Sequence, residues 1–386
     1  MSDALLIHNA RLITPQGVID GWLTIHEGKI AAFGAGSPPA DALPRLIDAQ
    51  GGWLLPGFID LHVHGALGCE TMDADPDGLR RMAKFYAAHG VTSFLPTTWT
   101  ASRAAIRAAL ACAASVMAQP PEGAQILGVH LEGPYLNALK CGAQDSTHIR
   151  RAERDEALEF LDTGVIRLLA LAPEFPENHW LIGECVARGI RVSAAHTNAT
   201  YDEMMTGVSL GVSQTTHTFN AMTGLHHRDP GVVGAALTQP VITCELIADN
   251  IHVHPAVMKL LWRVKGADGI VLISDAVRGA GLPEGASYLQ DNRPIVLRDG
   301  AVRLPDGTLA GSALTLDAGL RNFCAAAGTT VEQAWAVTSR NAARQIGIGD
   351  RKGSLTVGCD ADLVVLTPDL RVHTTIAAGR IIFERN

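Results

Sequence analysis

The chain has 386 residues, of which 47% are hydrophobic and 18% charged, and its formal net charge at pH 7 is −8. This composition supports a large buried core and excludes a mostly disordered chain or a coiled coil. The acidic balance argues against nucleic acid and against an anionic membrane surface as partners. The apolar runs are shorter than the ~20 residues of a membrane span, and no secretory signal precedes them. These features predict a cytoplasmic protein.

The two ends of the chain are predicted to be rich in short β-strands. Turn residues separate the expected strands, which cover 4–13, 21–27, 29–33 and 45–48 near the start and 362–366, 376–378 and 380–383 near the end. Both ends therefore differ from the sequence between them. We expect a small β-sandwich domain built from residues 1–55 and 353–386.

The sequence from 56 to 352 alternates between apolar runs and helical patterns. Eight runs are expected to be strands, at 58–64, 92–98, 126–132, 165–172, 191–196, 214–220, 242–249 and 270–275. Helical periodicity lies between most of them, at 77–89, 102–118, 154–162, 178–188 and 255–264. Continuous apolar strands separated by helices are typical of a parallel sheet covered on both faces. Eight such units predict an α/β fold with a (β/α)8 TIM-like catalytic barrel. No GxGxxG follows a strand, which disfavours an open dinucleotide-binding sheet.

Imidazoles and carboxylates stand at the ends of five of these predicted strands. They are His62, His64, Glu132, His196, His217 and Asp275. The carboxyl ends of barrel strands meet at one face, where barrel enzymes carry their active sites. His62 and His64 are two residues apart and therefore point to the same side of a strand. A nitrogen and oxygen ligand set without thiolates suits Zn²⁺, Fe²⁺, Mn²⁺ or Co²⁺. Six ligands exceed the need of one open catalytic ion, so we expect one or two divalent ions per chain.

Longer motifs around these residues carry a family resemblance. They are LLPGFIDLHVHG (54–65), GVHLEGPYLN (128–137), SAAHTNAT (193–200), THTFNAM (216–222), HHRDPG (226–231), IADNIHVHP (247–255), ISDAV (273–277), AGSALT (310–315) and GSLTVGCDADLVVL (353–366). Over almost its full length the sequence resembles the N-acetylglucosamine-6-phosphate deacetylases of the amidohydrolase superfamily. The first and last of these motifs are general to the superfamily, whereas HLEGP and FNAM are more specific to the deacetylases.

The resemblance implies how the metal ligands divide and what they do. Glu132, His196 and His217 would hold the principal ion, most simply zinc. His62 and His64 would hold a second ion together with Asp275 and the shared Glu132. The implied reaction converts an N-acetylhexosamine 6-phosphate, above all N-acetyl-D-glucosamine 6-phosphate, into the amino sugar phosphate and acetate. Metal-bound water attacks the acetyl carbonyl, and Asp275 acts first as general base and then as general acid.

The resemblance also implies residues that bind the phosphorylated amino sugar. These are Asn220, Ala221, His252 and Arg228, whose guanidinium suits phosphate because it donates two parallel hydrogen bonds. In the family this arginine reaches the site of a neighbouring subunit, which implies a homodimer. The plain alternative for Arg228 is a solvated loop cation.

Other histidines are expected to have lesser roles. His226 and His227 are expected at the rim, and His254 is expected to be structural. His130, two residues before Glu132, fits either a partner of the ligands or an ordinary core residue.

Two positions depart from the family pattern. Gln144 stands where the family has a histidine that hydrogen-bonds the scissile carbonyl, and a glutamine donates there without becoming a cation. Arg278 replaces a small residue, and its charge fits either an anionic substrate or a surface loop.

Because of these departures, a second hypothesis for the function remains, namely an amidohydrolase that acts on another amide. That amide would belong to N-acetylgalactosamine 6-phosphate, another N-acyl amino sugar, an N-acyl amino acid or a cyclic amide. A non-catalytic barrel is the third hypothesis, and the presence of all six candidate metal ligands argues against it.

Overall fold

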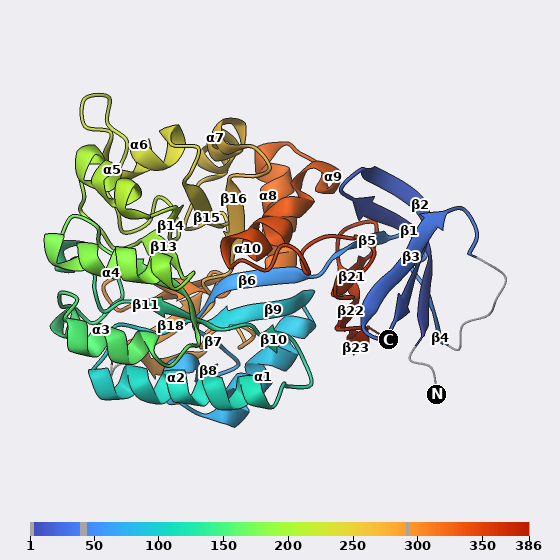
Figure 1. Cartoon of the computed structure of the whole chain (residues 1–386), viewed down its shortest axis with the longest axis horizontal. Helices are drawn as coiled ribbons and strands as arrows, with labels where there is room; N and C mark the ends of the chain where they lie inside the picture. Colours follow the sequence, from blue (N-terminus) through green and yellow to red (C-terminus); the bar gives the residue numbers. More distant parts are fainter. Residues whose placement is uncertain (1–3, 39–44, 291–292, 386) are drawn as a thin grey trace.

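Both ends of the chain build one eight-stranded sheet, seen at the right of Figure 1. The structure, a computed structural model, describes residues 4–38, 45–290 and 293–385. The sheet runs in the order β23-β22-β21-β5-β1-β2-β3, with β4 paired to β1. Its strands are β1 (Leu5–Thr14), β2 (Gly17–His26), β3 (Lys29–Ala35), β4 (Arg45–Asp48), β5 (Trp53–Pro56), β21 (Leu363–Leu366), β22 (Val372–Ala377) and β23 (Arg380–Glu384). The predicted terminal strands are therefore present and share one sheet.

A separate apolar core supports this sheet. Ile7, Leu23, Leu54, Leu363 and Ile376 are all fully buried in it, although they come from opposite ends of the sequence. Along β2, Gly21, Leu23 and Ile25 are buried and the residues between them are not, which is the period expected of a strand with one covered face. The terminal sheet thus depends on both ends of the chain being present.

The middle of the chain forms a curled parallel sheet consistent with a TIM-like barrel. One part has the order β10-β9-β6, and in the other part β11 to β16 pair in sequence order. Bridges between Thr97 and His130 and between Val63 and Ala276 connect the two parts. The strands are β6 (Phe58–Val63), β9 (Val91–Pro96), β10 (Gln125–Ile126), β11 (Val129–Glu132), β12 (Ile166–Leu171), β13 (Arg191–Ala194), β14 (Gln214–Thr215), β15 (Thr243–Ile247) and β16 (Ile270–Ile273). Each of the eight predicted runs overlaps at least one of these strands.

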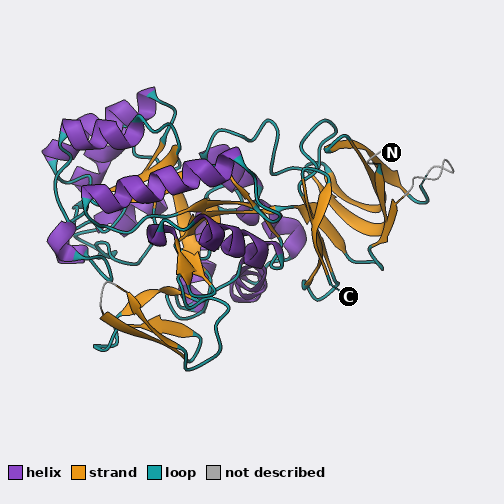
Figure 2. Cartoon of the chain, turned by 90° about the horizontal axis from the view of Figure 1, so that it is seen from below, coloured by secondary structure: helices purple, strands orange, loops and turns teal. Residues whose placement is uncertain are grey.

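Helices surround the parallel strands, as Figure 2 shows. They are α1 (Pro76–Ala87), α2 (Arg103–Ala118), α3 (Arg154–Leu161), α4 (Pro176–Ala187), α5 (Tyr201–Leu210), α6 (Gly231–Thr238), α7 (Pro255–Lys265), α8 (Leu316–Ala327), α9 (Val331–Ala334) and α10 (Arg340–Gln345). Short 3-10 helices are η1 (Thr71–Asp73), η2 (Ala138–Lys140), η3 (Ser146–His148) and η4 (Trp335–Thr338). Helix starts follow local chemistry: Thr200 and Glu203 form a reciprocal capping box at the start of α5.

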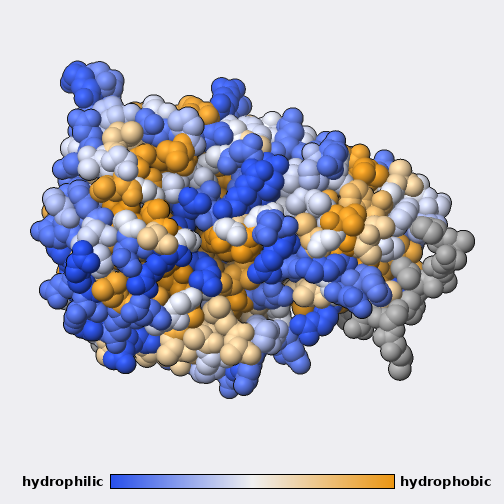
Figure 3. Space-filling model, in the orientation of Figure 1, coloured by the Kyte–Doolittle hydropathy of each residue, from blue (hydrophilic) through white to orange (hydrophobic). Residues whose placement is uncertain are grey.

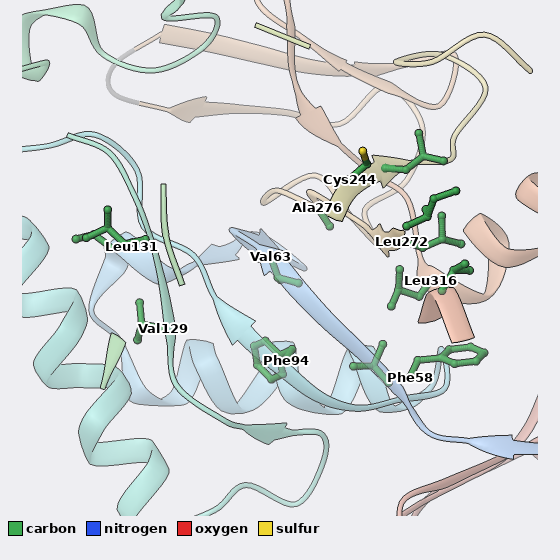
Figure 4. Packing of buried hydrophobic residues seen from close by; sticks show 14 of the residues in the cluster. Phe58, Val63, Phe94, Val129, Leu131, Cys244, Leu272, Ala276 and Leu316 are labelled. Atoms are coloured by element: carbon green, nitrogen blue, oxygen red, sulfur yellow. The ribbon is translucent and has the colours of Figure 1, made fainter. Parts of the chain in front are cut away.

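Large apolar side chains fill the space between the strands and this outer layer. Figure 4 shows Phe58, Phe94, Leu131, Leu272 and Leu316 in this core, and each is 1% exposed or less. On the outside, hydrophilic residues cover much of the face in Figure 3, with smaller apolar areas between them. No helix among the described residues is long and apolar enough to cross a membrane.

One part of the fold was not expected from the sequence. Four antiparallel strands lie between β16 and α8 and form the small sheet at the lower left of Figure 2. They are β17 (Ser287–Gln290), β18 (Arg293–Arg298), β19 (Ala301–Arg303) and β20 (Leu309–Ser312). A two-stranded ribbon of β7 (Gly65–Ala66) and β8 (Cys69–Glu70) follows β6.

A buried ion pair supports the residues that lead into the terminal sheet. Lys352 is 2% exposed, and its ammonium group contacts the carboxylates of Asp362 and Asp360. It also donates to Gln125 on β10 at 3.0 Å. This single side chain therefore connects the parallel sheet to the start of β21.

Candidate metal centre and active site

The six predicted ligand residues lie together at the carboxyl ends of the parallel strands. His62 is within β6 and His64 follows it, Glu132 ends β11, His196 and His217 follow β13 and β14, and Asp275 follows β16. Each of the six is at most 7% exposed. The topology of the sheet thus brings together side chains that are up to 213 positions apart in the sequence.

Backbone conformation helps to aim three of these side chains. The φ angles of His196, His217 and Asp275 are +42°, +33° and +49°, in the left-handed region that non-glycine residues rarely adopt. Each such residue costs on the order of 1–3 kcal/mol, and such strain clusters at functional sites. All three turn directly after a strand, which is where a side chain must leave the pleat to face the centre.

The first ligand group contains the two histidines of the HxH motif. The Nε2 atoms of His62 and His64 are 3.1 Å apart. Asp275 Oδ1 is 3.4 Å from each of them, and Glu132 Oε2 is 3.5 Å from His62 Nε2 and 3.2 Å from His64 Nε2.

The second ligand group contains the other two histidines. The Nε2 atoms of His196 and His217 are 3.2 Å apart, and Glu132 Oε1 lies 3.2 and 3.1 Å from them. Glu132 therefore presents one carboxylate oxygen to each histidine pair, which is the arrangement of a carboxylate that bridges two ions.

These distances fit a metal. Two nitrogens bound at about 2.0–2.1 Å to a tetrahedral zinc ion lie about 3.3 Å apart, close to the separation within each histidine pair. His196 Nδ1 lies 2.8 Å from the carbonyl oxygen of Lys140, to which it can only donate, so Nε2 keeps its lone pair. The donor set and the geometry both fit one or two divalent ions.

The electrostatics of the cluster also favour bound positive charge. Burial disfavours the charged form of His62, but Glu132 and Asp275 outweigh this and raise its pKa well above the usual range. Burial likewise opposes ionisation of Asp275, yet His62 and His64 lower its pKa to about 2. The pKa of Glu132 is lowered well below its usual value in the same way. Both carboxyl groups are ionised at neutral pH, as metal ligands must be.

A cavity of about 370 Å³ opens onto this cluster. Its lining includes four of the predicted substrate residues, namely Gln144, Asn220, Ala221 and His252. The unexpected sheet contributes Leu309 and Gly311 of β20 to the same lining, and the turn before β20 contributes Thr308. The volume falls within the range of small-molecule sites.

Gln144 is the predicted departure from the family, and its amide orientation is defined by its neighbours. The backbone N–H of Thr100 donates to Gln144 Oε1 at 2.7 Å. The amide Nε2 therefore faces the cluster, where it donates to Glu132 Oε2 at 2.8 Å. Gln144 is 2% exposed and supplies a neutral hydrogen-bond donor directly beside the shared carboxylate.

His252 is held by a carboxylate from its own loop. Its Nδ1 lies 2.6 Å from Asp249 Oδ2, while Asp249 Oδ1 accepts the backbone N–H groups of Ile251 and His252. Burial opposes ionisation of Asp249, but these hydrogen bonds outweigh it and lower its pKa. Because Nδ1 is occupied, Nε2 is the nitrogen of His252 that is free to bind a ligand.

Arg228 and Arg278 lie outside the cavity lining. Arg228 is exposed and donates to His227 at 2.6 Å, in the same exposed loop as His226. Arg278, in the loop that follows β16, forms ion pairs with Glu70 of β8 at 3.0 Å and with Asp73 of η1 at 2.5 Å. Because two carboxylates already pair with its guanidinium, a role in stabilising a surface loop is favoured over contact with an anionic substrate.

The remaining histidines behave as side chains of the framework. His254 caps α7 by accepting the N–H of Ala256, as a structural residue would. His130 is fully buried, with its ring packed edge-on against His62 at 4.6 Å between centroids.

Sequence reasoning missed three residues that support the site. Trp99 stacks on the His64 ring at 3.9 Å between centroids, and Glu245 contacts His62. Asp249 orients His252, as described above. Two of these had a visible signal: Glu245 is a charge inside an apolar strand, and Asp249 precedes His252 by three residues. Trp99 had none, because its partner is distant in sequence.

Comparison with known proteins agrees with this geometry. Residues 53–382 match the amidohydrolase family. The chain is 38% identical to the N-acetylglucosamine-6-phosphate deacetylase of Lysinibacillus sphaericus, with 99% of each chain covered. It is 37% identical to the N-acetylgalactosamine-6-phosphate deacetylase of Escherichia coli O157:H7, over 96% of this chain and 97% of that protein.

A solved structure extends the likeness to the whole fold. The crystal structure of the N-acetylglucosamine-6-phosphate deacetylase of Thermotoga maritima superimposes with a TM-score of 0.89 at 35% identity, covering 98% of this chain and 100% of that one. The match includes both the parallel sheet and the terminal sheet. The chain therefore belongs to the amidohydrolase family and, within it, to the N-acetylglucosamine-6-phosphate deacetylase family of amide-hydrolysing enzymes.

Proposed function

We propose that this enzyme hydrolyses the acetamide group of N-acetyl-D-glucosamine 6-phosphate, giving glucosamine 6-phosphate and acetate. The observation that carries this proposal is that the two carboxylate oxygens of Glu132 contact different histidine pairs beside Asp275. These groups lie at the floor of a cavity of suitable size. The relatives' names supply the substrate class.

The chain's own residues define the roles in this reaction. Divalent ions, most simply zinc, would be held by the two ligand groups and would lower the pKa of water and polarise the acetyl carbonyl. Asp275 is ionised and adjacent to both HxH imidazoles, so it accepts a proton from the attacking water and returns it to the departing nitrogen. Gln144 Nε2, which donates to Glu132 Oε2, is proposed as a neutral hydrogen-bond donor for the acetyl carbonyl oxygen. Hydrolysis consumes one water and releases one acetate and one amine.

The sugar phosphate is proposed to lie against Asn220, Ala221 and His252. Among the described residues that line the cavity, Lys140 is the one lysine or arginine, and no arginine contributes. A guanidinium for the phosphate must therefore come from outside the lining of this cavity. The proposed source is the exposed Arg228 of a second copy of the chain. This makes the active form a homodimer.

We also propose domain limits for this architecture. Residues 56–352 would be the catalytic (β/α)8 barrel, and residues 1–55 with 353–386 would be the small β-sandwich domain. The pairing of β21 with β5 and the separate core around Ile7 support this division. A cytoplasmic location follows from the metabolic substrate.

Acetate release tests the substrate proposal. Purified protein with a measured metal content would be offered N-acetylglucosamine 6-phosphate, N-acetylgalactosamine 6-phosphate and both free sugars. We expect kcat/KM to be highest for the glucosamine derivative. A higher kcat/KM for N-acetylgalactosamine 6-phosphate would favour the activity named for the Escherichia coli relative instead. Turnover of none of the four sugars would refute the proposal.

A variant separates the phosphate role of Arg228 from its loop role. R228A is expected to raise KM for the phosphorylated sugar by at least about 10-fold, since a charge-assisted bond contributes about 1.5–3 kcal/mol. Arg380, an exposed arginine on β23 of the terminal sheet, provides the matched control as R380A. An unchanged KM, or a monomer of full activity, would contradict the shared site.

A further inference from the structure

A carboxylate lies behind the metal cluster without belonging to it. Glu245 is in the middle of β15, and its side chain is fully buried. A buried carboxylate is costly unless its oxygens are hydrogen-bonded, so its partners show what it is there to hold.

Both oxygens of Glu245 are used. Oε2 accepts from His62 Nδ1 at 3.2 Å and from the backbone N–H of His217 at 3.3 Å. Oε1 accepts from Gln214 Nε2 at 2.5 Å. His62 and His217 belong to different ligand groups, so one carboxylate contacts a member of each.

A third metal site at this position is the competing interpretation. His62, His130 and Glu245 are close enough to hold an ion together. However, a neutral imidazole has one lone pair, and His62 Nε2 already points to His64, Glu132 and Asp275. His62 Nδ1 must then carry the hydrogen, which it donates to Glu245, and it has no lone pair left for a third ion.

We propose that Glu245 is a positioning residue that links the two ion sites. It fixes the tautomer and ring orientation of His62 and, through the same oxygen, the backbone turn at His217. Carboxylates that hold metal-binding histidines in this way typically change metal affinity by about 10–100-fold. The inference rests on the proposed metal-dependent function. It predicts that loss of Glu245 weakens mainly the ion held by His62 and His64, because Glu245 contacts the side chain of His62 but only the backbone of His217.

The variant E245Q tests this assignment. A glutamine can keep its oxygen towards the N–H groups of His62 and His217 if Gln214 turns its own amide to accept the new N–H. Its neutral oxygen is then a weaker acceptor for the His62 N–H than the carboxylate. We expect the Kd of the zinc ion held by His62 and His64 to rise about 10–100-fold, and the Kd of the ion held by His196 and His217 to change by less than about 3-fold. In crystals grown at limiting zinc, the anomalous peak between His62 and His64 should fall while that between His196 and His217 remains. Activity should return when zinc is raised.

Two further variants keep the result interpretable. E156Q neutralises another buried glutamate, which contacts Arg150 and Tyr135 away from the cluster, and it should leave both zinc affinities unchanged. Q214M removes one hydrogen bond to Glu245 without changing its charge, and it should weaken the same ion by a smaller factor. Q214M decides the matter if E245Q fails to fold.

The outcomes separate this inference from the proposed function. Wild-type protein that binds zinc and releases acetate, with E245Q and Q214M unchanged in both zinc affinities, would overturn the role of Glu245 alone. Equal loss of both ions in E245Q would overturn the assignment of the larger effect to the His62–His64 ion. A wild-type protein that binds no metal would overturn the proposed function itself.

Discussion

Replacing Gln144 by leucine separates two contacts that meet at one amide. The side chain accepts from the buried Thr100 N–H and donates to Glu132. Leucine keeps the approximate volume and removes both bonds. An unpartnered buried N–H costs about 1–3 kcal/mol, and the lost donor to a carboxylate about 1.5–3 kcal/mol. Since 1.4 kcal/mol is about a factor of ten, we expect exchange of the Thr100 amide hydrogen to accelerate by about 10–100-fold.

The matched control is Q144E, which keeps an acceptor for Thr100 but replaces the donor with a second carboxylate beside Glu132. Thr100 exchange should stay near the wild-type rate in Q144E and rise in Q144L. Both variants should lose kcat, by about 10²-fold if the lost donor acts on the developing oxyanion. Hydrogen exchange by mass spectrometry and acetate release measure the two effects. Unchanged exchange and unchanged kcat in Q144L would refute the reasoning.

Three further substitutions test other parts of the structure. K352M leaves the buried Asp362 carboxylate without its cation, whereas Asp360 keeps Lys29 and Arg351. The free energy of unfolding should therefore fall by about 3–5 kcal/mol while kcat per folded molecule is unchanged; a stable K352M in chemical denaturation would contradict this. Burial opposes ionisation of Asp317, but His89 outweighs it and lowers the Asp317 pKa to about 2. This contributes about 2 kcal/mol that is present above pH 4 and lost as pH falls towards 2, so D317N should flatten the acid limb of a stability–pH curve. D249N removes the carboxylate that orients His252, and KM for the phosphorylated sugar should rise about 10-fold, with the free sugar unaffected.

Strand periodicity predicted most of the metal centre. Each ligand lies at the end of an apolar run, and a parallel sheet brings such ends to one face, so His62, Glu132 and Asp275 were found without knowledge of their distances. The terminal strands were also predictable, because turn residues delimit them. The resemblance supplied the division of roles, which periodicity alone left open.

The contacts between neighbouring strands were not predictable in this way. A pattern along one strand gives the direction of a side chain but not its partner on another strand, which is why the Glu245 and Trp99 contacts were missed. The sheet from β17 to β20 was missed because its strands are short and pair antiparallel within a single insertion. Arg278 was ambiguous since its partners, Glu70 and Asp73, precede it by about 200 residues.

Acetate release measured against bound metal tests the central claim most directly. Metal-free protein would be titrated with Zn²⁺, and acetate and glucosamine 6-phosphate would be quantified from N-acetylglucosamine 6-phosphate at each ratio of ion to chain. The account predicts no turnover without metal and equal amounts of the two products once the sites are filled. Full activity in the metal-free protein, or an intact substrate after loading with metal, would contradict it.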